Sequence, residues 1–118
     1  MQTNTLESLY ADILSSGGMT YRPGTPAPVA GYMVSVAGAE RMLPVARFTP
    51  TALEQYMSDY RARMKTTDAL YYGAWIDGDY VYLDVSVNVQ GRAEAEAMGR
   101  LESQLAIYDV TNAEVISL

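Results

Sequence analysis

Apolar residues near the N-terminus recur at the spacing of one helical turn. They are Leu6, Leu9, Tyr10, Ile13 and Leu14. Such a stripe is typical of an amphipathic helix that packs one face on a core. Asn4 with Glu7 three residues later has the form of a capping box, and Gly17 can end a helix in a left-handed conformation. The pattern predicts a helix between Asn4 and Gly17.

The next segment is rich in proline and glycine. Residues 19–31, "MTYRPGTPAPVAG", exclude a helix and predict a short strand followed by an extended surface loop. Residues 32–45, "YMVSVAGAERMLPV", then alternate and carry Gly38-Ala39 in the middle. The alternation predicts a hairpin that turns at Gly38-Ala39 and buries one face. That face consists of Tyr32, Val34, Val36, Leu43 and Val45.

Two further segments have helical patterns. Thr49 followed by Pro50 is a typical helix start. The apolar stripe of this helix consists of Leu53, Tyr56, Met57, Tyr60 and Met64. Residues 91–104, "GRAEAEAMGRLESQ", are rich in helix formers. The predicted apolar side of this last helix consists of Ala93, Ala97, Met98, Leu101 and Leu105.

Residues 71–85, "YYGAWIDGDYVYLDV", combine alternation with a turn signal at Asp77-Gly78. A two-residue turn there pairs Ile76 with Asp79 and sets the register of both strands. The predicted core face consists of Leu70, Tyr72, Ala74, Val81, Leu83 and Val85. The opposite face consists of Tyr71, Gly73, Trp75, Tyr80, Tyr82 and Asp84.

The order of these elements indicates the fold class. "LAIYDV" and "AEVISL", joined at Thr111-Asn112, predict a final strand pair. Hairpins rather than strand-helix-strand crossovers predict an antiparallel sheet. We therefore expect residues 1–118 to form a single α+β domain, with an antiparallel sheet built of hairpins and about three helices packed mainly on one side.

Composition and charge exclude several classes of function. The net charge is −6 and the 8 basic residues are scattered, which disfavours nucleic-acid binding. The chain has no histidine and no cysteine, so Ser-His-Asp and Cys-His catalysis and the usual zinc sites are excluded. No nucleotide-binding or nucleophile-elbow motif occurs, and we expect no cofactor.

No stretch approaches the about 18 apolar residues of a membrane helix, and the N-terminus lacks the pattern of a secretory signal. We therefore expect no membrane partner and a cytoplasmic location in a host cell. Exposed strand edges favour self-pairing, so a homodimer is the expected oligomeric state.

Carboxylates are the remaining candidates for catalysis. Asp77, Asp79 and Asp84 could bind a divalent cation through their oxygens, but aspartates are also what a tight hairpin turn favours. We therefore predict no metal site, with these three residues as the alternative. Asp84 and Asp109 would be a general acid/base pair only if the strands brought them together.

The aromatic face of the hairpin is the main candidate for binding. Its rings are Tyr71, Trp75, Tyr80 and Tyr82. Either a helix of the same chain covers them, or they are exposed. An exposed group of this composition is typical of a protein interface.

The C-terminal half resembles a recurrent group of small uncharacterised proteins of actinobacterial phages, prophages and plasmids. The resemblance is carried by "GAWIDGDYVYLDVSVNVQGRAEAEAMGRLESQLAIYDV", with "GYMVSV" and "FTPTALEQYM" before it, and spans about residues 17–118. "GAWID", "AIYD" and the acidic balance also resemble ArdA-type antirestriction proteins, which imitate DNA and have a higher charge density.

The resemblance implies a phage or mobile-element accessory protein, and the residue patterns favour a binding protein over an enzyme. It would act by protein–protein binding, against a host defence or regulatory factor. The first alternative is a small carboxylate- or metal-dependent enzyme. The second is a structural component of the virion.

Overall fold

Seven strands form one antiparallel sheet in the computed structural model, which describes residues 5–118. The helices are α1 (Leu6–Ser16), α2 (Pro50–Asp59), α3 (Arg61–Met64) and α4 (Arg92–Leu101), with a 3-10 turn η1 (Val45–Arg47). The strands are β1 (Gly18–Tyr21), β2 (Tyr32–Ser35), β3 (Arg41–Pro44), β4 (Leu70–Asp77), β5 (Tyr80–Val89), β6 (Ala106–Asp109) and β7 (Glu114–Ser117). Asn4 of the predicted capping box lies outside the described residues.

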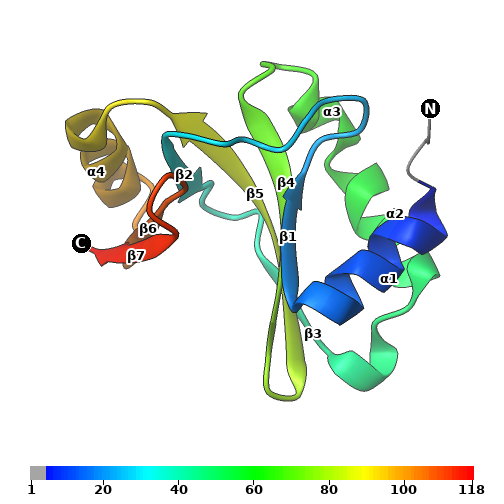
Figure 1. Ribbon diagram of the computed structural model, residues 1–118. Coiled ribbons are helices and arrows are strands. Elements are labelled where there is room, and N and C mark those ends of the chain that lie inside the picture. Colours follow the sequence, from blue (N-terminus) through cyan, green and yellow to red (C-terminus); the bar gives the residue numbers. More distant parts are fainter. Residues whose placement is uncertain (1–4) are drawn as a thin grey trace.

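The strand register places the residues that α1, α2 and α4 cover on the same face of the sheet, which confirms the predicted α+β class. Figure 1 shows α1, α2 and α3 on one side of the molecule and α4 on the other, beside β2, β6 and β7. Leu9 and Ile13 of α1 and Leu53 of α2 pack against one half of the sheet. Ala95 of α4 packs against the other half, in a second cluster with Val34. The inward-facing residues of β5 that these helices cover are Val81, Leu83, Val85 and Val87. One face of the sheet therefore carries both hydrophobic core clusters.

The helix starts follow the sequence signals. Thr49 caps α2, with its hydroxyl accepting from the Ala52 N–H at 3.1 Å and Pro50 at the first helical position. Thr5 caps α1 in the same way, and Gly17 ends α1 with a φ of 81°. The predicted end of the first helix at Gly17 and the predicted start of the second at Thr49 are confirmed. The N-cap of α1 is Thr5 and not Asn4, and the second predicted helix, whose stripe ran to Met64, is interrupted at Tyr60 between α2 and α3.

The predicted hairpin over residues 32–45 is wrong. β2 and β3 do not pair with each other, because both pair antiparallel with β5. β5 has 10 residues, long enough to pair with β2 at one end and β3 at the other. Between β2 and β3 the chain turns at Ala37 and Gly38, and the Val36 N–H still donates to the Val85 carbonyl at 2.8 Å.

The hairpin of β4 and β5 has a register two residues away from the predicted one. Trp75 lies opposite Tyr82 and Asp77 lies opposite Tyr80. The turn therefore consists of Gly78 and Asp79, with Gly78 first at a φ of 59°. A turn of this kind needs a positive φ only at its first position. Because strand side chains alternate with a period of two, a two-residue shift leaves both predicted faces unchanged.

The predicted buried side of the last helix is wrong except at Met98, which packs against the second core cluster. Leu101 and Leu105 are 82% and 89% exposed, whereas Ala95 and Gly99 are buried. α4 lies so close to the C-terminal strands that a Cβ at Gly99 would be 2.5 Å from Leu118 Cδ1 and 3.0 Å from an Ile107 methyl group. Small residues are therefore what this interface accepts. The final strand pair, β6 with β7, is confirmed.

Candidate functional site

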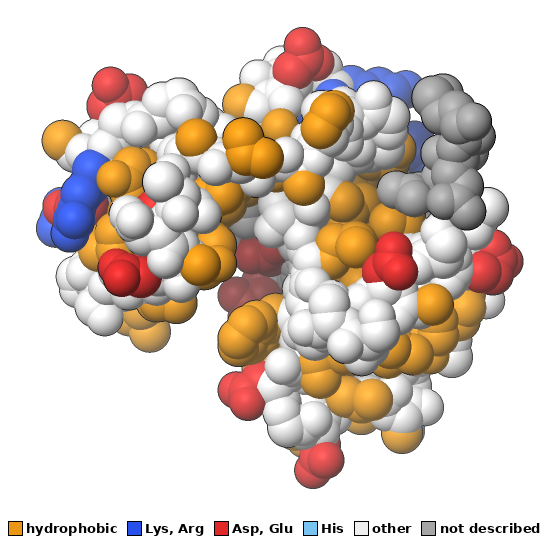
Figure 2. All heavy atoms as spheres, viewed as in Figure 1, with side chains coloured by type: hydrophobic (Ala, Val, Ile, Leu, Met, Phe, Trp, Pro, Cys, Tyr) orange, Lys and Arg blue, Asp and Glu red, His pale blue; other side chains and the backbone are white. Residues whose placement is uncertain are grey.

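The sheet face opposite the helices is hollow. Figure 2 shows a deep recess between the two lobes of the molecule, with acidic side chains at its back and hydrophobic ones along its walls. The cleft has a volume of ≈ 940 Å³ and is lined by β1, β2, β4, β5, β6 and β7. We call it the open-face cleft.

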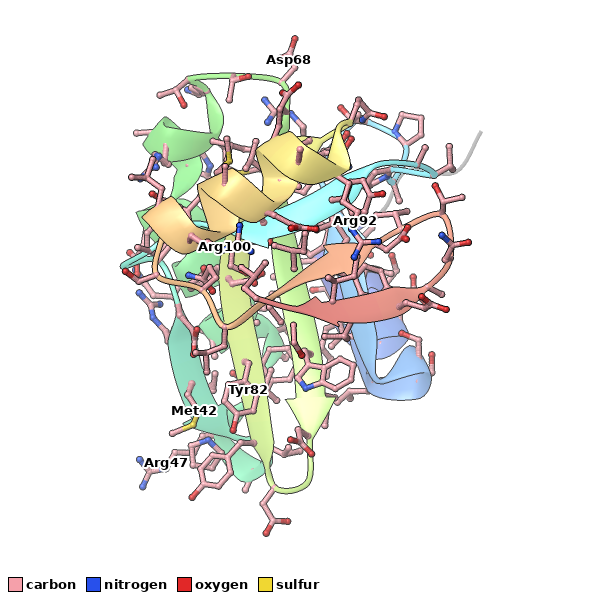
Figure 3. All side chains as sticks on the ribbon, turned by 90° about the vertical axis from the view of Figure 1, so that its left-hand side faces the viewer. Met42, Arg47, Asp68, Tyr82, Arg92 and Arg100 are labelled. Carbon is pink, nitrogen blue, oxygen red and sulfur yellow. The ribbon has the colours of Figure 1, made fainter. Side chains whose placement is uncertain are left out.

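Trp75 and Tyr82 form one wall of the open-face cleft, and they belong to an apolar row that crosses three strands and ends outside the cleft at Met42. Trp75 of β4 lies opposite Tyr82 of β5, and Tyr82 lies opposite Met42 of β3. Directly opposed residues point to the same side of a sheet, so the three side chains are neighbours. Figure 3 shows Met42 and Tyr82 side by side. Trp75 is 61% exposed, and Met42 is also exposed.

The other wall is a second row formed by distant parts of the chain. Met33 of β2 lies opposite Tyr108 of β6, and Tyr108 lies opposite Val115 of β7. Met33 is buried, whereas Tyr108 and Val115 are exposed. The pairing of β2 with β6 therefore places a tyrosine and a valine across the cleft from the Trp75 row.

Asp84 lies on the floor between the two rows. The Ser35 hydroxyl donates to Asp84 Oδ2 at 2.6 Å, and the Ser86 hydroxyl donates to the same oxygen over 3.4 Å. Burial raises the pKa of the Asp84 carboxyl above its ordinary value, and the two serine hydrogen bonds act in the opposite direction. The two serine hydrogen bonds thus hold the carboxylate in place, although burial has removed part of its hydration shell.

Gly73, opposite Asp84 on β4, makes room for this carboxylate. A Cβ at Gly73 would overlap Asp84 Oδ1, so the carboxylate extends over the bare glycine backbone. The absence of a side chain at position 73 is therefore part of how the floor is built.

Gly73→Ala is expected to lower the free energy of unfolding by about 1–3 kcal/mol, because the added methyl group displaces the carboxylate. The same change in an Asp84→Ala background is expected to cost little, since the overlapping group is gone. Urea denaturation of the two single variants and the double variant measures the coupling. Strictly additive effects would contradict this packing.

The predicted binding residues divide into two groups. Trp75 and Tyr80 are exposed and Tyr82 is partly exposed, all on the uncovered face. Tyr71 is a correction, since it lies on the same face but only 9% of it is exposed. It lies opposite the buried Ser86, deeper in the sheet than the other rings. Tyr71 therefore belongs to the interior and not to the accessible surface.

The carboxylate candidates are not brought together. Asp77 and Asp84 line the cleft, but residues 5–118 contain no group of three acidic side chains placed to hold a metal ion. Asp109 lies opposite Tyr32, on the helix-covered face, whereas Asp84 faces the cleft. The condition for an Asp84–Asp109 acid/base pair, that the strands bring the two together, is therefore not met. Asp109 instead accepts from the Asn112 backbone and side chain, which lower the pKa of its carboxyl.

Sequence reasoning missed Ser35, Met42, Tyr108 and Val115. The alternation of residues 32–45 does place Ser35 and Met42 away from the core, but it contains no signal that both strands pair with β5. Tyr108 alternates with the buried Ile107 in the same way. The pairing of strands distant in the chain brings Ser35, Tyr108 and Val115 to the cleft and places Met42 beside Tyr82 at its margin.

Comparison with known protein families, curated proteins and solved structures finds no match for this chain. Within residues 5–118, no helix combines the length and the apolar character needed to cross a bilayer. The case for a function therefore stands on the cleft itself.

Proposed function

We propose that this chain acts by binding another protein through the open-face cleft. The observation that carries the proposal is the 61% exposure of Trp75 in an apolar row beside a large recess. Exposed tryptophan and tyrosine side chains are frequent centres of protein interfaces, because each buries a large area at a small entropic cost. In line with its sequence resemblance, we propose a phage or mobile-element accessory role in a host cytoplasm, against a defence or regulatory factor.

Trp75→Ala and Tyr82→Ala are expected to abolish capture of the partner from an actinobacterial host lysate, with circular dichroism unchanged and little shift in melting temperature. Each substitution removes a ring from the accessible face and leaves the helix-covered core intact. Affinity capture with mass spectrometry measures the loss. Leu101→Ala is the control, because Leu101 is also an exposed large apolar residue, at 82%, but lies on α4 and away from the cleft. Capture by Trp75→Ala at the wild-type level would contradict the proposal.

A second copy of the chain is one partner that we propose for this face. Sedimentation velocity of the wild type and of Trp75→Ala separates the two cases. A wild-type dimer that becomes a monomer in Trp75→Ala would assign the cleft to self-association, as the exposed strand edges lead us to expect.

A further inference from the structure

Asp84 has no counter-ion in the described part of the chain. The ion pairs of residues 5–118 join Arg22 to Asp68, Arg41 to Asp59, and Arg92 and Arg100 to Glu96. Figure 3 shows Arg92 and Arg100 on α4, not beside Met42 and Tyr82. Asp84 Oδ1 accepts no hydrogen bond from the described residues, since both serine hydroxyls bind Oδ2.

The surroundings of Asp84 carry charge of one sign. The open-face cleft is lined by the carboxylates of Glu40, Asp77 and Asp84, and no arginine or lysine of residues 5–118 lines it. Low-dielectric walls strengthen the field of these groups inside the recess. The cleft therefore attracts cations and repels anions.

The aromatic residues of the cleft suit the same kind of ligand. Trp75, Tyr82 and Tyr108 line it from both walls. The faces of such rings attract a cation through their quadrupoles, and guanidinium groups in particular stack on them. In such a site the carboxylate binds the positive charge of a guanidinium group, and the aromatic ring stacks on its flat face.

We propose that the open-face cleft receives an arginine side chain of the partner protein, with its guanidinium group against Asp84 Oδ1. This inference rests on the proposed protein-binding function of the same face. The bound cation would offset the cost of holding a carboxylate away from water without a charged partner. Asp84 would then select the partner, while the apolar rows supply most of the contact area.

A side chain of a protein fits this cleft better than a free cation. The apolar rows continue past the floor to Met42 on one side and Val115 on the other, and both are exposed. A small cation bound to Asp84 would leave these surfaces in contact with water. A peptide segment with apolar residues on both sides of an arginine would cover them.

The test uses the full-length chain and short synthetic peptides. The probes are acetyl-Leu-Arg-Leu-amide, its citrulline counterpart, its lysine counterpart and acetyl-arginine-amide. Citrulline keeps the shape of arginine and lacks the charge. Trp75 is the single tryptophan of the chain, so its fluorescence reports binding in the cleft directly. Each peptide is titrated into the wild type and into Asp84→Asn.

The arginine peptide is expected to bind the wild type roughly tenfold more tightly than the citrulline peptide, and to lose this advantage in Asp84→Asn. The lysine peptide and acetyl-arginine-amide are expected to bind more weakly than the arginine peptide. Tighter binding of the lysine peptide would overturn the choice of arginine. Equal binding of acetyl-arginine-amide would overturn the assignment to a protein segment.

Two further results would overturn the inference. They are equal binding of the arginine and citrulline peptides, and no fluorescence change with the arginine peptide. The citrulline arm changes the ligand and not the protein, so it stays decisive whatever Asp84→Asn does to the fold. A different experiment tests the protein-binding function itself. That function would be contradicted if Trp75→Ala captured the cellular partner at the wild-type level.

Discussion

Leu83→Ala is expected to lower the free energy of unfolding by about 2–5 kcal/mol, whereas Trp75→Ala is expected to cost about 1 kcal/mol or less. The two residues lie on the same hairpin, on adjacent rows of its ladder. Leu83 is 1% exposed in the core under the helices, and its truncation leaves a cavity. Trp75 faces the open cleft, so its truncation removes little more than a cross-strand neighbour of Tyr82.

Urea denaturation followed by circular dichroism measures both effects, because Trp75→Ala removes the fluorescent probe. Tyr72→Ala is a second control, since Tyr72 is an aromatic residue on the buried face of the same strand. Its loss is expected to resemble that of Leu83→Ala. A loss for Trp75→Ala as large as that for Leu83→Ala would place Trp75 in the core and remove the proposed binding surface.

Asp84→Asn is expected to raise the stability of the protein at neutral pH, by on the order of 1 kcal/mol. Burial raises the pKa of the Asp84 carboxyl in the folded state. The folded state then binds this proton more tightly than the unfolded state, so stability falls as the pH rises from the unfolded pKa through the folded one. At neutral pH the wild type bears this full cost, and asparagine avoids it while keeping an oxygen for the Ser35 hydroxyl.

The advantage of Asp84→Asn is expected to shrink below pH about 4, where aspartate is protonated in both states. Thermal melts over a range of pH measure it. The other ionisable residues of the cleft, Glu40, Asp77, Tyr82 and Tyr108, are unchanged, so the difference isolates Asp84.

Asp109→Asn supplies a control of opposite sign. Hydrogen bonds from Asn112 lower the pKa of the Asp109 carboxyl in the folded state, so ionised Asp109 stabilises the fold above its unfolded pKa. Asp109→Asn is therefore expected to destabilise the protein at neutral pH, and this loss should fade in acid. An Asp84→Asn variant that is less stable than the wild type at neutral pH and unchanged in acid would contradict the description of the cleft floor.

A side chain that lowers the stability of the fold and faces a recess is characteristic of a functional site. There the group that favours binding can be one that disfavours folding. Asp84 combines these properties with Trp75 and Tyr82 on the adjoining wall. The same substitution, Asp84→Asn, should therefore stabilise the fold and weaken binding of the arginine peptide. Structural residues of the core would lose both together.

The sequence predicted the two faces of the hairpin correctly although it misplaced the turn. Face assignment depends only on the alternation of side chains, which a two-residue error in register does not disturb. The position of the turn depends on which turn residue takes the positive φ. Gly78 can be the second residue of an Asp77-Gly78 turn or the first residue of a Gly78-Asp79 turn, and the sequence does not distinguish the two. In the structure Gly78 is the first turn residue. The second, Asp79, accepts a hydrogen bond at its carbonyl from the Val45 N–H.

The composition of the cleft could not be predicted in the same way. Residues 32–45 alternate identically whether they pair with each other or, as they do, with β5. The wall formed by Tyr108 and Val115 depends on the pairing of β2 with β6, which joins segments about seventy-five residues apart in sequence and leaves no local pattern. The buried side of α4 was mispredicted for a related reason. The helix packs so closely on the C-terminal strands that the interface accepts the small residues Ala95 and Gly99 and leaves Leu101 exposed, and the sequence does not show how close this packing is.

The exposure of Trp75 is the most direct test of the open-face cleft, and acrylamide quenching of tryptophan fluorescence measures it. Because Trp75 is the single tryptophan, the signal has one source. We expect the folded protein to show a quenching constant close to that of the urea-unfolded chain, as the 61% exposure implies. A strongly protected indole with blue-shifted emission, at every protein concentration, would show that the protein covers this face itself and would contradict the account.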